Sequence, residues 1–345
     1  MSLDGFSMHR LVRELDAALS GSRIDKITQP NRTTVQFAVR QPGQNLFFCI
    51  SVRPQNPAIF LLDVPLENPT EPSSYCMLLR KHLETGRIAA IRQHGLDRVI
   101  FIDVDILASG GRIVTKTLAV ELMGKYSNII LIEDGKIIDA LRRVSAMNSR
   151  VRLVLPSGEY QPLSNEEKLN ALAATPEKFV LHLRKRRDMT LVKAISDACL
   201  GFGPVTAKEI SFSAGLSPDT QIDTLDDSDF SSLSNAFAET VAVMLNETLP
   251  AVLLRDEKGK LIAMAAFPLH AFMETKEERF PNMSSLLIRA DLLIGNYAPP
   301  DKERFQKLVR NKLRRAQNKR QKLYEEADEA KNADEFRQKA DTLAT

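Results

Sequence analysis

Hydrophobic and polar positions follow one period up to about residue 162 and another beyond it. In the first part, short apolar stretches alternate with polar residues and are separated by Pro, Asn and Gly, which indicates antiparallel strands. Two stretches instead place apolar residues three and four apart, which predicts helices over 6–19 and 75–86. The predicted strands cover 23–29, 33–40, 45–52, 58–64, 87–93, 99–106, a segment ending in 121–125, 128–133 and 136–140.

Beyond Ser164 the apolar spacing is mainly helical. Helix-start signals predict helices that open at Asn165, at Pro176 after a Thr175 cap, near Asp188 and at Pro204. The polar, acidic stretch 219–232 is predicted to be a loop, and a helix to about Leu249 follows it. A β-hairpin is predicted over 251–256 and 260–267, around Glu257-Lys258-Gly259.

A long, charged helix is predicted from Asp301 to about Ala330. Its apolar residues lie near a seven-residue repeat that Lys312 and Lys319 interrupt, and such a thin seam is typical of one arm of a coiled coil. Residues 301–324 hold ten basic and two acidic side chains. The basic section is therefore a candidate RNA contact, and a simply solvated helix is the alternative.

These patterns predict an α+β protein in three parts. The parts are an antiparallel-β domain over 1–163, a helical helix-hairpin-helix domain with a terminal β-hairpin over 164–280, and the start of a coiled-coil arm over 281–345.

Gly201-Phe202-Gly203 joins two predicted helices in the manner of a helix-hairpin-helix. Glycines at such a turn let backbone N–H groups approach a phosphate at the start of the second helix. An ordinary helix stop at Gly201 and helix start at Pro204 explain the same residues equally well. Upstream, Arg184, Lys185, Arg186 and Arg187 form a basic run, which is either a solvated surface or an additional contact to an RNA backbone.

The net charge of +3 is unevenly distributed. Residues 301–345 contain 13 Lys/Arg and 9 Asp/Glu, or +4, so residues 1–300 carry +3 minus +4, which is −1. If the main body binds nucleic acid, we expect it to do so through local basic clusters rather than an overall positive field.

Composition argues against several classes of site and location. The three cysteines are scattered and the five histidines lack ligand spacing, so we expect buried free thiols and neither a metal nor another cofactor. No nucleotide-loop, hydrolase or kinase motif is present, and Asp103 and Asp105 are better explained as solvent-facing than as an acid pair. Apolar runs are too short for a membrane span and the N-terminus lacks a signal core, so a cytoplasmic location is expected.

Asp97 and Arg98 stand where a turn at Gly95 meets a predicted strand. Inside a strand the two side chains would point to opposite faces of the sheet, but just before the strand begins both could reach one ligand. Arg98 could grip a phosphate or base edge and Asp97 could accept from a base amino group or ribose hydroxyl. A surface charge pair is the alternative, just as Asp4 could simply cap the first helix.

Several motifs together resemble the NFACT family. They are Leu3-Asp-Gly5, Arg23-Ile-Asp-Lys-Ile-Thr-Gln-Pro30, Cys76-Met-Leu-Leu-Arg-Lys-His-Leu83 with Gly86-Arg-Ile88, Leu96-Asp-Arg-Val99 and Glu121-Leu-Met-Gly-Lys-Tyr-Ser-Asn128. The resemblance covers the chain in order and implies an N-terminal NFACT domain similar to the head of the DNA glycosylase Fpg. A helix-hairpin-helix domain and a coiled-coil arm would follow it.

The resemblance also implies a function in ribosome-associated quality control. Family members bind large ribosomal subunits obstructed by peptidyl-tRNA, and bacterial members recruit alanyl-tRNA to extend the stalled chain with an alanine tail. The expected role is that of a tRNA-positioning factor without a catalytic residue, because the ribosome makes the peptide bonds. Asp97 and Arg98 match the family's tRNA-engaging pair, and Asp4, Glu121, Leu122 and Met123 match other positions important for tRNA binding.

Two other functions stay open at this stage. An older family label implies a fibronectin-binding surface adhesin, for which the sequence shows neither a signal peptide nor a wall anchor. The Fpg-like fold suggests a DNA-binding or repair protein, but that chemistry uses an N-terminal Pro-Glu and this chain begins Met-Ser-Leu-Asp. The family's second arm and C-terminal domain are not in the sequence, so an N-terminal fragment is expected.

Overall fold

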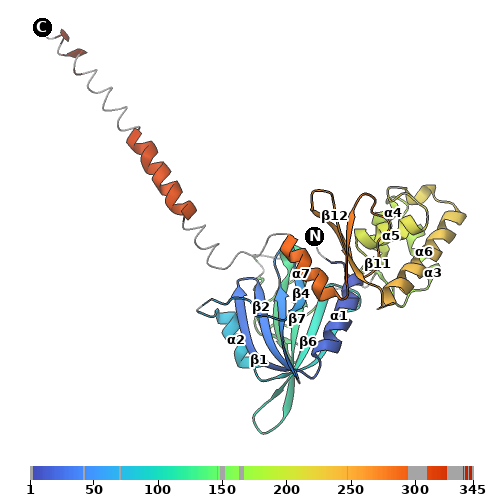
Figure 1. Ribbon diagram of the computed structural model, residues 1–345, viewed down its shortest axis with the longest axis horizontal. Helices are drawn as coiled ribbons and strands as arrows, with labels where there is room; N and C mark the ends of the chain where they lie inside the picture. Colours follow the sequence, from blue (N-terminus) through green and yellow to red (C-terminus); the bar gives the residue numbers. More distant parts are fainter. Residues whose placement is uncertain are drawn as a thin grey trace. The chain divides into compact units, whose positions relative to one another are not determined.

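The computed structural model describes most of the chain (Figure 1). The described residues are 3–41, 43–69, 71–145, 147, 152–162, 167–246, 248–293, 309–324, 337, 339–340 and 342–343. Contacts group the chain into two compact units, Met1–Asn296 and Tyr297–Thr345. The predicted boundaries after residues 163 and 280 both fall inside the first unit and stay predictions.

A nine-stranded antiparallel sheet forms the body of the first unit. Its order is β4-β3-β2-β1-β5-β6-β7-β8-β9. The strands are β1 Arg23–Asn31, β2 Thr34–Gln41, β3 Gln44–Ser51, β4 Ala58–Leu62, β5 Arg87–Gln93, β6 Val99–Leu107, β7 Ile113–Glu121, β8 Asn128–Glu133 and β9 Lys136–Ala140. The predicted mixture of helices and antiparallel strands is confirmed, with strand ends within two residues of most predicted positions.

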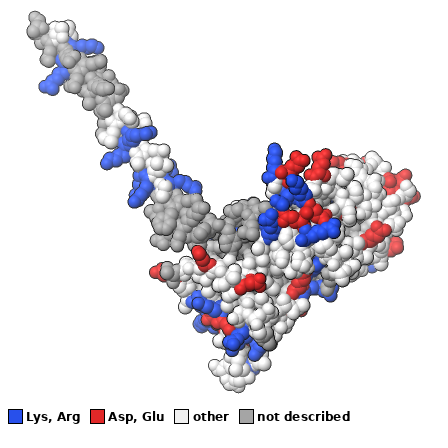
Figure 2. Space-filling view, viewed as in Figure 1, with Lys and Arg blue, Asp and Glu red and all other residues white. Residues whose placement is uncertain are grey.

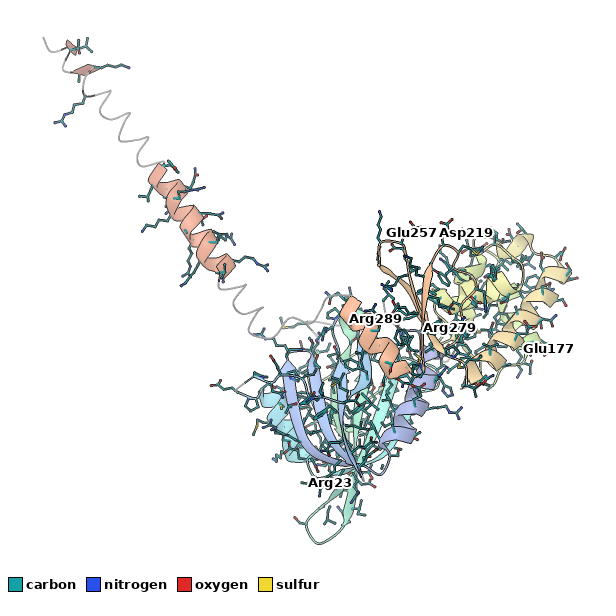
Figure 3. All side chains as sticks on the ribbon, viewed as in Figure 1. Arg23, Glu177, Asp219, Glu257, Arg279 and Arg289 are labelled. Atoms are coloured by element: carbon teal, nitrogen blue, oxygen red, sulfur yellow. The ribbon has the colours of Figure 1, made fainter. Side chains whose placement is uncertain are left out.

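The sheet folds into two layers because β1 and β5 pair only at their first residues. Within the described parts of these two strands, only Arg23 and Arg87 are register partners, and the adjoining hydrogen bonds join Ile24 to Gly86 and Ile88 to Ser22, just outside the paired strands. The layers β4-β3-β2-β1 and β5-β6-β7-β8-β9 meet at this corner, which Figure 3 marks with Arg23. Apolar side chains of both layers belong to one core cluster, which includes Phe48 and Ile100. The loops at the end of the two layers opposite the Arg23 corner therefore lie near one another.

Two helices complete this core. α1 (Gly5–Leu19) begins at the loop end of the sheet and α2 (Ser74–Leu83) packs against β1. The predicted N-cap at Asp4 is confirmed, since its carboxylate accepts from the Ser7 N–H. A short second cluster on the other side of β6 to β9 includes Val99 and Ile130.

Four helices follow, with one short strand before the first of them and another between the second and third. They are α3 Pro176–Arg184, α4 Leu191–Ala198, α5 Pro204–Ser213 and α6 Asp227–Leu245, while β10 Leu169–Asn170 pairs with β11 Cys199–Leu200. Phe179 of α3 stacks on Phe237 of α6 with ring centroids 4.3 Å apart. Phe202, just before α5, meets Phe6 of α1 edge-on at 4.6 Å and lies 6.1 Å from Phe237, so aromatic packing joins α6 to α1.

Three helical predictions need correction. The helix expected from Asn165 is wrong over its described residues, because 167–168 form a turn and 169–170 pair as β10; residues 163–166 lie outside the described part. α4 begins at Leu191 rather than near Asp188. α6 begins inside the expected acidic loop, because Asp226 and Asp229 form a capping box that satisfies the first N–H groups.

A small sheet and a helix close the first unit. The sheet is ordered β13-β12-β14, from β12 Ala251–Arg255, β13 Leu261–Ala265 and β14 Lys276–Phe280. The predicted hairpin is confirmed, whereas β14 and α7 (Met283–Leu293) carry no distinct sequence signal. Arg289 of α7 binds Glu278 of β14 at 2.8 Å, and Figure 3 shows Arg289 and the neighbouring Arg279 on these elements.

In the second unit, residues 309–324 are helical with every side chain exposed. Figure 2 shows only Lys and Arg among the charged side chains of this stretch. A coiled-coil pairing of this helix stays a prediction. Among the described residues, no helix combines the length and apolar character needed to cross a membrane.

Candidate functional site

Asp4 ties the start of α1 to the start of α5. One carboxylate oxygen accepts from the Ser7 N–H at 2.9 Å, which caps α1. The other accepts from the Thr206 hydroxyl at 2.6 Å and from the Gly203 N–H at 3.2 Å, at the first turn of α5. A single carboxylate therefore satisfies donors at two helix N-termini, where a negative charge is also favoured by both helix dipoles.

The Gly201 turn packs directly against the β5–β6 loop. The Phe6 N–H donates to the Gly201 carbonyl at 3.0 Å, and a Cβ built on Gly201 would run into the Leu96 carbonyl oxygen. Gly5 is equally confined, because its Cβ would also meet that oxygen and would lie 2.9 Å from the Gly201 Cα. Close backbone approach at this joint therefore requires both glycines.

A hollow of about 360 Å³ opens beside this joint. We call it the sheet-end hollow; its lining combines apolar residues with charged residues from three separate parts of the chain. The lining residues are Leu3, Asp4, Gly5, Leu96, Asp97, Arg98, Lys168, Cys199, Leu200, Gly201, Phe202, Gly203 and Pro204. The structure thus brings together Asp4, the Asp97-Arg98 pair and the Gly201 turn, which the sequence presented as separate candidates.

Asp97 and Arg98 meet the geometric condition for a shared ligand. Both side chains are partly exposed and line the sheet-end hollow. The Asp97 Oδ1 accepts from the Arg98 N–H at 2.7 Å, which leaves its second oxygen without a partner among the described residues. Among those residues the Arg98 guanidinium has no hydrogen-bond acceptor or ion-pair partner either. A cationic fork and a carboxylate oxygen are thus available to a ligand in the hollow.

Lys168 is a candidate that the sequence did not indicate. It precedes β10, and its Nζ donates to the Ser196 carbonyl at 3.0 Å and lies 3.7 Å from the Asp197 carboxylate. It adds a second cation to the hollow lining. The helix expected at this point would have placed Lys168 on a helix surface, so no local signal could have found it.

The Gly203 N–H already has an acceptor. The Asp4 carboxylate occupies the position that a phosphate would take at the N-terminus of α5. A phosphate contact at Gly201 and Gly203 stays a prediction, but an anion would have to compete with Asp4 there. The glycines are fully explained by the close packing of the joint.

Glu121 and Leu122 lie in the interior, at 2% and 1% exposure. Glu121 forms an ion pair with Arg152 at 2.7 Å and accepts from the Tyr160 hydroxyl at 2.9 Å. Burial, followed by the neighbouring Glu121 charge, raises the pKa of Tyr160. Any role of Glu121 and Leu122 in tRNA binding must therefore act by positioning the chain, while Met123 is partly exposed.

The basic run at the end of α3 divides into exposed and structural residues. Arg186 turns inward, with its Nε 2.8 Å from Asp197 and its Nη1 2.7 Å from the His182 carbonyl. Arg184 pairs with Asp227 at 2.6 Å and covers the Phe230 ring at 4.0 Å. Lys185 and Arg187 are exposed, so these two are the members of the run most available to an RNA backbone.

All three cysteines are buried free thiols, as predicted. Burial raises the pKa of Cys49 and of Cys199, which lines the hollow, to about 12. Burial also raises the pKa of Cys76. A thiol that stays protonated is a poor nucleophile, which argues against a role for Cys199 in covalent chemistry.

We expect these thiols to resist Ellman's reagent in the folded protein. At pH 8 a thiol with a pKa of about 12 is ionised in only about one molecule in ten thousand, so colour should develop slowly. The same protein in 8 M urea should release its colour rapidly, which serves as the control. Rapid reaction of a thiol in the folded protein would contradict the buried, protonated state.

The fold and hollow define a class of protein first. It is an α+β protein in which a folded antiparallel sheet meets a group of helices at a polar, partly cationic hollow. A family model described as NFACT N-terminal and middle domains matches residues 4–345. The chain belongs to the NFACT family.

Two curated relatives are similar to this chain over nearly its whole length. The Rqc2 homolog RqcH of Bacillus subtilis (strain 168) is 31% identical over 343 residues, which cover 97% of this chain and 57% of the relative. The Rqc2 homolog RqcH of Streptococcus pneumoniae (strain D39) is 30% identical over 352 residues, covering 100% and 58%. The chain therefore spans less than three fifths of the length of these relatives.

Two solved structures are similar in fold. The fibrinogen binding protein from Staphylococcus aureus has a TM-score of 0.69 and 28% identity, covering 83% of this chain and 97% of that one. The N-terminal part of the fibronectin/fibrinogen-binding protein from Streptococcus suis has a TM-score of 0.67 and 29% identity, covering 85% and 99%. The likeness to an Fpg head stays a prediction.

Proposed function

We propose that this chain is the tRNA-binding part of a ribosome-associated quality-control factor. It would bind tRNA and large ribosomal subunits obstructed by peptidyl-tRNA, in the cytoplasm, and recruit alanyl-tRNA for alanine tailing of stalled chains. Support comes from NFACT membership and from relatives named Rqc2 homolog RqcH. Because the chain spans only part of those relatives, the activity of the whole protein is itself part of the proposal.

The sheet-end hollow carries the proposal in structural terms. It presents, on one surface, an Asp97 carboxylate oxygen and an Arg98 guanidinium that has no partner within the described part of the chain. A guanidinium binds phosphate or a guanine edge through two parallel bonds, and a carboxylate accepts from base amino groups and ribose hydroxyls. Such a pair suits an RNA nucleotide better than an entirely anionic or entirely apolar ligand.

The role we propose is positioning, without chemistry on this chain. Asp97 and Arg98 would hold the tRNA, Lys168 would add charge neutralisation, and peptide-bond formation would remain with the ribosome. Asp4, Glu121 and Leu122 would act indirectly, since their polar or apolar groups are engaged inside the protein. No cofactor is required for such a role.

Helices α4 and α5 would serve as the helix-hairpin-helix, and Lys185 and Arg187 would add backbone contacts. The helix over 309–324 would be the start of the coiled-coil arm, where its basic side chains face either RNA or the subunit. Its charged residues are Arg310, Lys312, Arg314, Arg315, Lys319, Arg320 and Lys322.

Removing the pair tests the proposal. We expect Asp97→Ala with Arg98→Ala to weaken binding of labelled tRNA about a hundredfold, because each charge-assisted hydrogen bond contributes about 1.5–3 kcal/mol. Thermal stability should change little, because both side chains are partly exposed and make few internal contacts. Fluorescence anisotropy and thermal unfolding measure the two effects.

Arg92→Ala with Asp103→Ala is the matched control. It removes one arginine and one aspartate from β5 and β6, the strands that flank the Asp97-Arg98 loop, where they form an ion pair at 2.9 Å outside the hollow lining. Equal loss of tRNA binding in both double variants would refute a specific role for Asp97 and Arg98. Loss of folding in the Asp97/Arg98 variant would also count against a binding role.

The solved relatives supply the second candidate function. One is a fibrinogen binding protein and the other a fibronectin/fibrinogen-binding protein, which makes adhesion the alternative function for this chain. Co-purification of the full-length protein from cells, followed by sequencing of bound RNA, separates the two. Recovery of neither tRNA nor large-subunit RNA, together with retention on immobilised fibronectin, would favour the adhesin.

A further inference from the structure

Four loops meet at the end of the folded sheet, next to the sheet-end hollow. The Val52 N–H donates to the Thr33 carbonyl at 2.8 Å, which joins the β1–β2 turn to the β3–β4 loop. The Arg142 guanidinium donates to the Val52 carbonyl at 3.3 Å and to the Lys125 carbonyl at 3.1 Å. The end of β9 and the β7–β8 loop are thereby drawn onto the same surface.

Side-chain hydrogen bonds cross-link this junction. The Asn128 side chain donates to the Arg142 carbonyl at 2.8 Å and accepts from the Arg142 N–H at 2.9 Å. The Ser127 hydroxyl closes the β7–β8 turn on the Gly124 carbonyl at 2.7 Å, where Gly124 has a φ of +58°. The backbone that carries Lys125 and Tyr126 is therefore hydrogen-bonded in place before any ligand arrives.

Tyr126 stands on this turn with 70% of its surface exposed. The Lys125 Nζ lies 4.9 Å from the centre of its ring. Tyr126 belongs to neither hydrophobic cluster, so core packing does not account for it. An exposed aromatic ring beside a cation is the arrangement on which unpaired nucleobases stack.

The four loop segments carry charge of one sign. Residues 31–33, 52–57, 122–127 and 141–145 contain Arg32, Arg53, Lys125, Arg142 and Arg143 and no Asp or Glu. Arg143 is neutralised by Asp139 at 2.8 Å, whereas Arg32, Lys125 and Arg142 have no carboxylate partner among the described residues. Residues 1–300 carry a net charge of −1, so this is a local basic cluster on a body that is otherwise slightly acidic.

The basic cluster of the four loops adjoins the sheet-end hollow. The Leu122 N–H donates to the Arg98 carbonyl at 2.9 Å, and only Met123 and Gly124 separate Leu122 from Lys125. An RNA strand that engages Arg98 would therefore meet the β7–β8 turn next. We name Arg32, Lys125, Tyr126 and Arg142 the loop-end patch.

We propose that the loop-end patch is a second RNA contact, in which an unpaired base stacks on Tyr126 and the adjoining phosphates bind Lys125, Arg32 and Arg142. The inference rests on the proposed tRNA-binding function and extends it along the end of the sheet. The patch would increase the affinity for RNA without selecting a particular base, because stacking and phosphate contacts are largely independent of sequence.

Replacing the ring tests the stacking. With fluorescein-labelled unfractionated tRNA, we expect Tyr126→Ala to weaken binding about tenfold and Tyr126→Phe to change it less than about twofold. Ile113→Ala, which alters a side chain that is 66% exposed at the opposite end of the sheet, is the control and should bind like the unaltered chain. Thermal unfolding should be unchanged in all three, since these side chains lie on the surface.

Salt dependence tests the phosphate contacts. Lys125→Ala with Arg32→Ala should reduce the slope of log affinity against log salt by about 1.4, at about 0.7 for each lost contact to a single strand. Lys136→Ala with Arg112→Ala, which removes two exposed cations, one at the start of β9 and one in the β6–β7 loop, should leave the slope unchanged. An equal decrease in both double variants would overturn the patch as a localised contact.

The outcomes separate the two hypotheses. Unchanged binding by Tyr126→Ala, alongside lost binding by the Asp97/Arg98 variant, would overturn the patch and leave the proposed function standing. Absence of tRNA binding by the unaltered chain would overturn both. Weakened binding by Tyr126→Ala that Tyr126→Phe restores would support the patch directly.

Discussion

Gly201→Ala is expected to lower the free energy of unfolding by about 3–5 kcal/mol, because it combines backbone strain with a collision at a packed joint. Gly201 has a φ of +81°, which an L-residue adopts only at a cost. An added Cβ would also strike the Leu96 carbonyl oxygen and lie 3.1 Å from the Phe6 nitrogen. The joint must open to relieve this, at the expense of the Phe6 N–H to Gly201 hydrogen bond.

Gly21→Ala separates the collision from the strain. Gly21 has the same φ of +81°, but nothing lies within 4 Å of the Cβ it would gain. Its cost should be only about 1–2 kcal/mol, the penalty of the left-handed conformation alone. Urea unfolding of both variants measures the difference, and equal costs would show that the joint yields freely.

Gly201→Ala should also distort the sheet-end hollow. Gly201 and Leu96 both line it, so a displaced turn changes the distance between Arg98 and the opposite wall. We expect tRNA affinity to decrease in any folded Gly201→Ala protein, while Gly21→Ala binds normally. Stability and binding would thus be linked through one backbone contact.

Arg10→Ala is expected to cost about 3–5 kcal/mol, the typical loss when one partner of a buried ion pair is removed. Arg10 is 4% exposed and pairs with Glu14 at 2.9 Å. Its guanidinium also donates to the carbonyls of Leu249 at 2.5 Å and Ala266 at 2.8 Å, which flank the β12–β13 hairpin. One side chain of α1 therefore fastens the small sheet, and its loss leaves buried acceptors unpaired.

Arg13→Ala is the matched control. Arg13 is an exposed arginine on the same helix, so its replacement should cost about 1 kcal/mol or less. Adding Glu14→Ala to Arg10→Ala should cost less than the sum of the single changes, because the two residues form one network. Full additivity in the unfolding measurements would show that Arg10 contributes independently of Glu14, through its bonds to the Leu249 and Ala266 carbonyls and its packing.

Local sequence signals were sufficient for most elements of the first unit. Alternating apolar residues and Asn, Pro or Gly punctuation located β1 to β9, since strand pairs with short turns are encoded by neighbouring residues. The Thr175-Pro176 start of α3 and the Pro204 start of α5 were likewise local. α6 was misplaced at its start because its acidic capping box looked like a polar loop.

Elements that depend on distant contacts were not predictable in the same way. β14 is held by pairing with β12, and α7 begins where the Met283 N–H donates to Glu14, 269 positions away. Lys168 reached the hollow because β10 pairs with β11, although its own neighbours suggested a helix. No short window of sequence contains such information.

The sequence by itself determined the α+β class, three buried thiols and a set of candidate residues that included Asp4, Asp97 and Arg98. Only the tertiary structure decided how these residues relate. It placed all three at one hollow, engaged the Asp4 carboxylate between two helices, and buried Glu121 against Arg152 and Tyr160. The physical reason is that periodicity fixes which side of an element is apolar, whereas long-range packing fixes which polar groups are already satisfied and which remain available to a ligand.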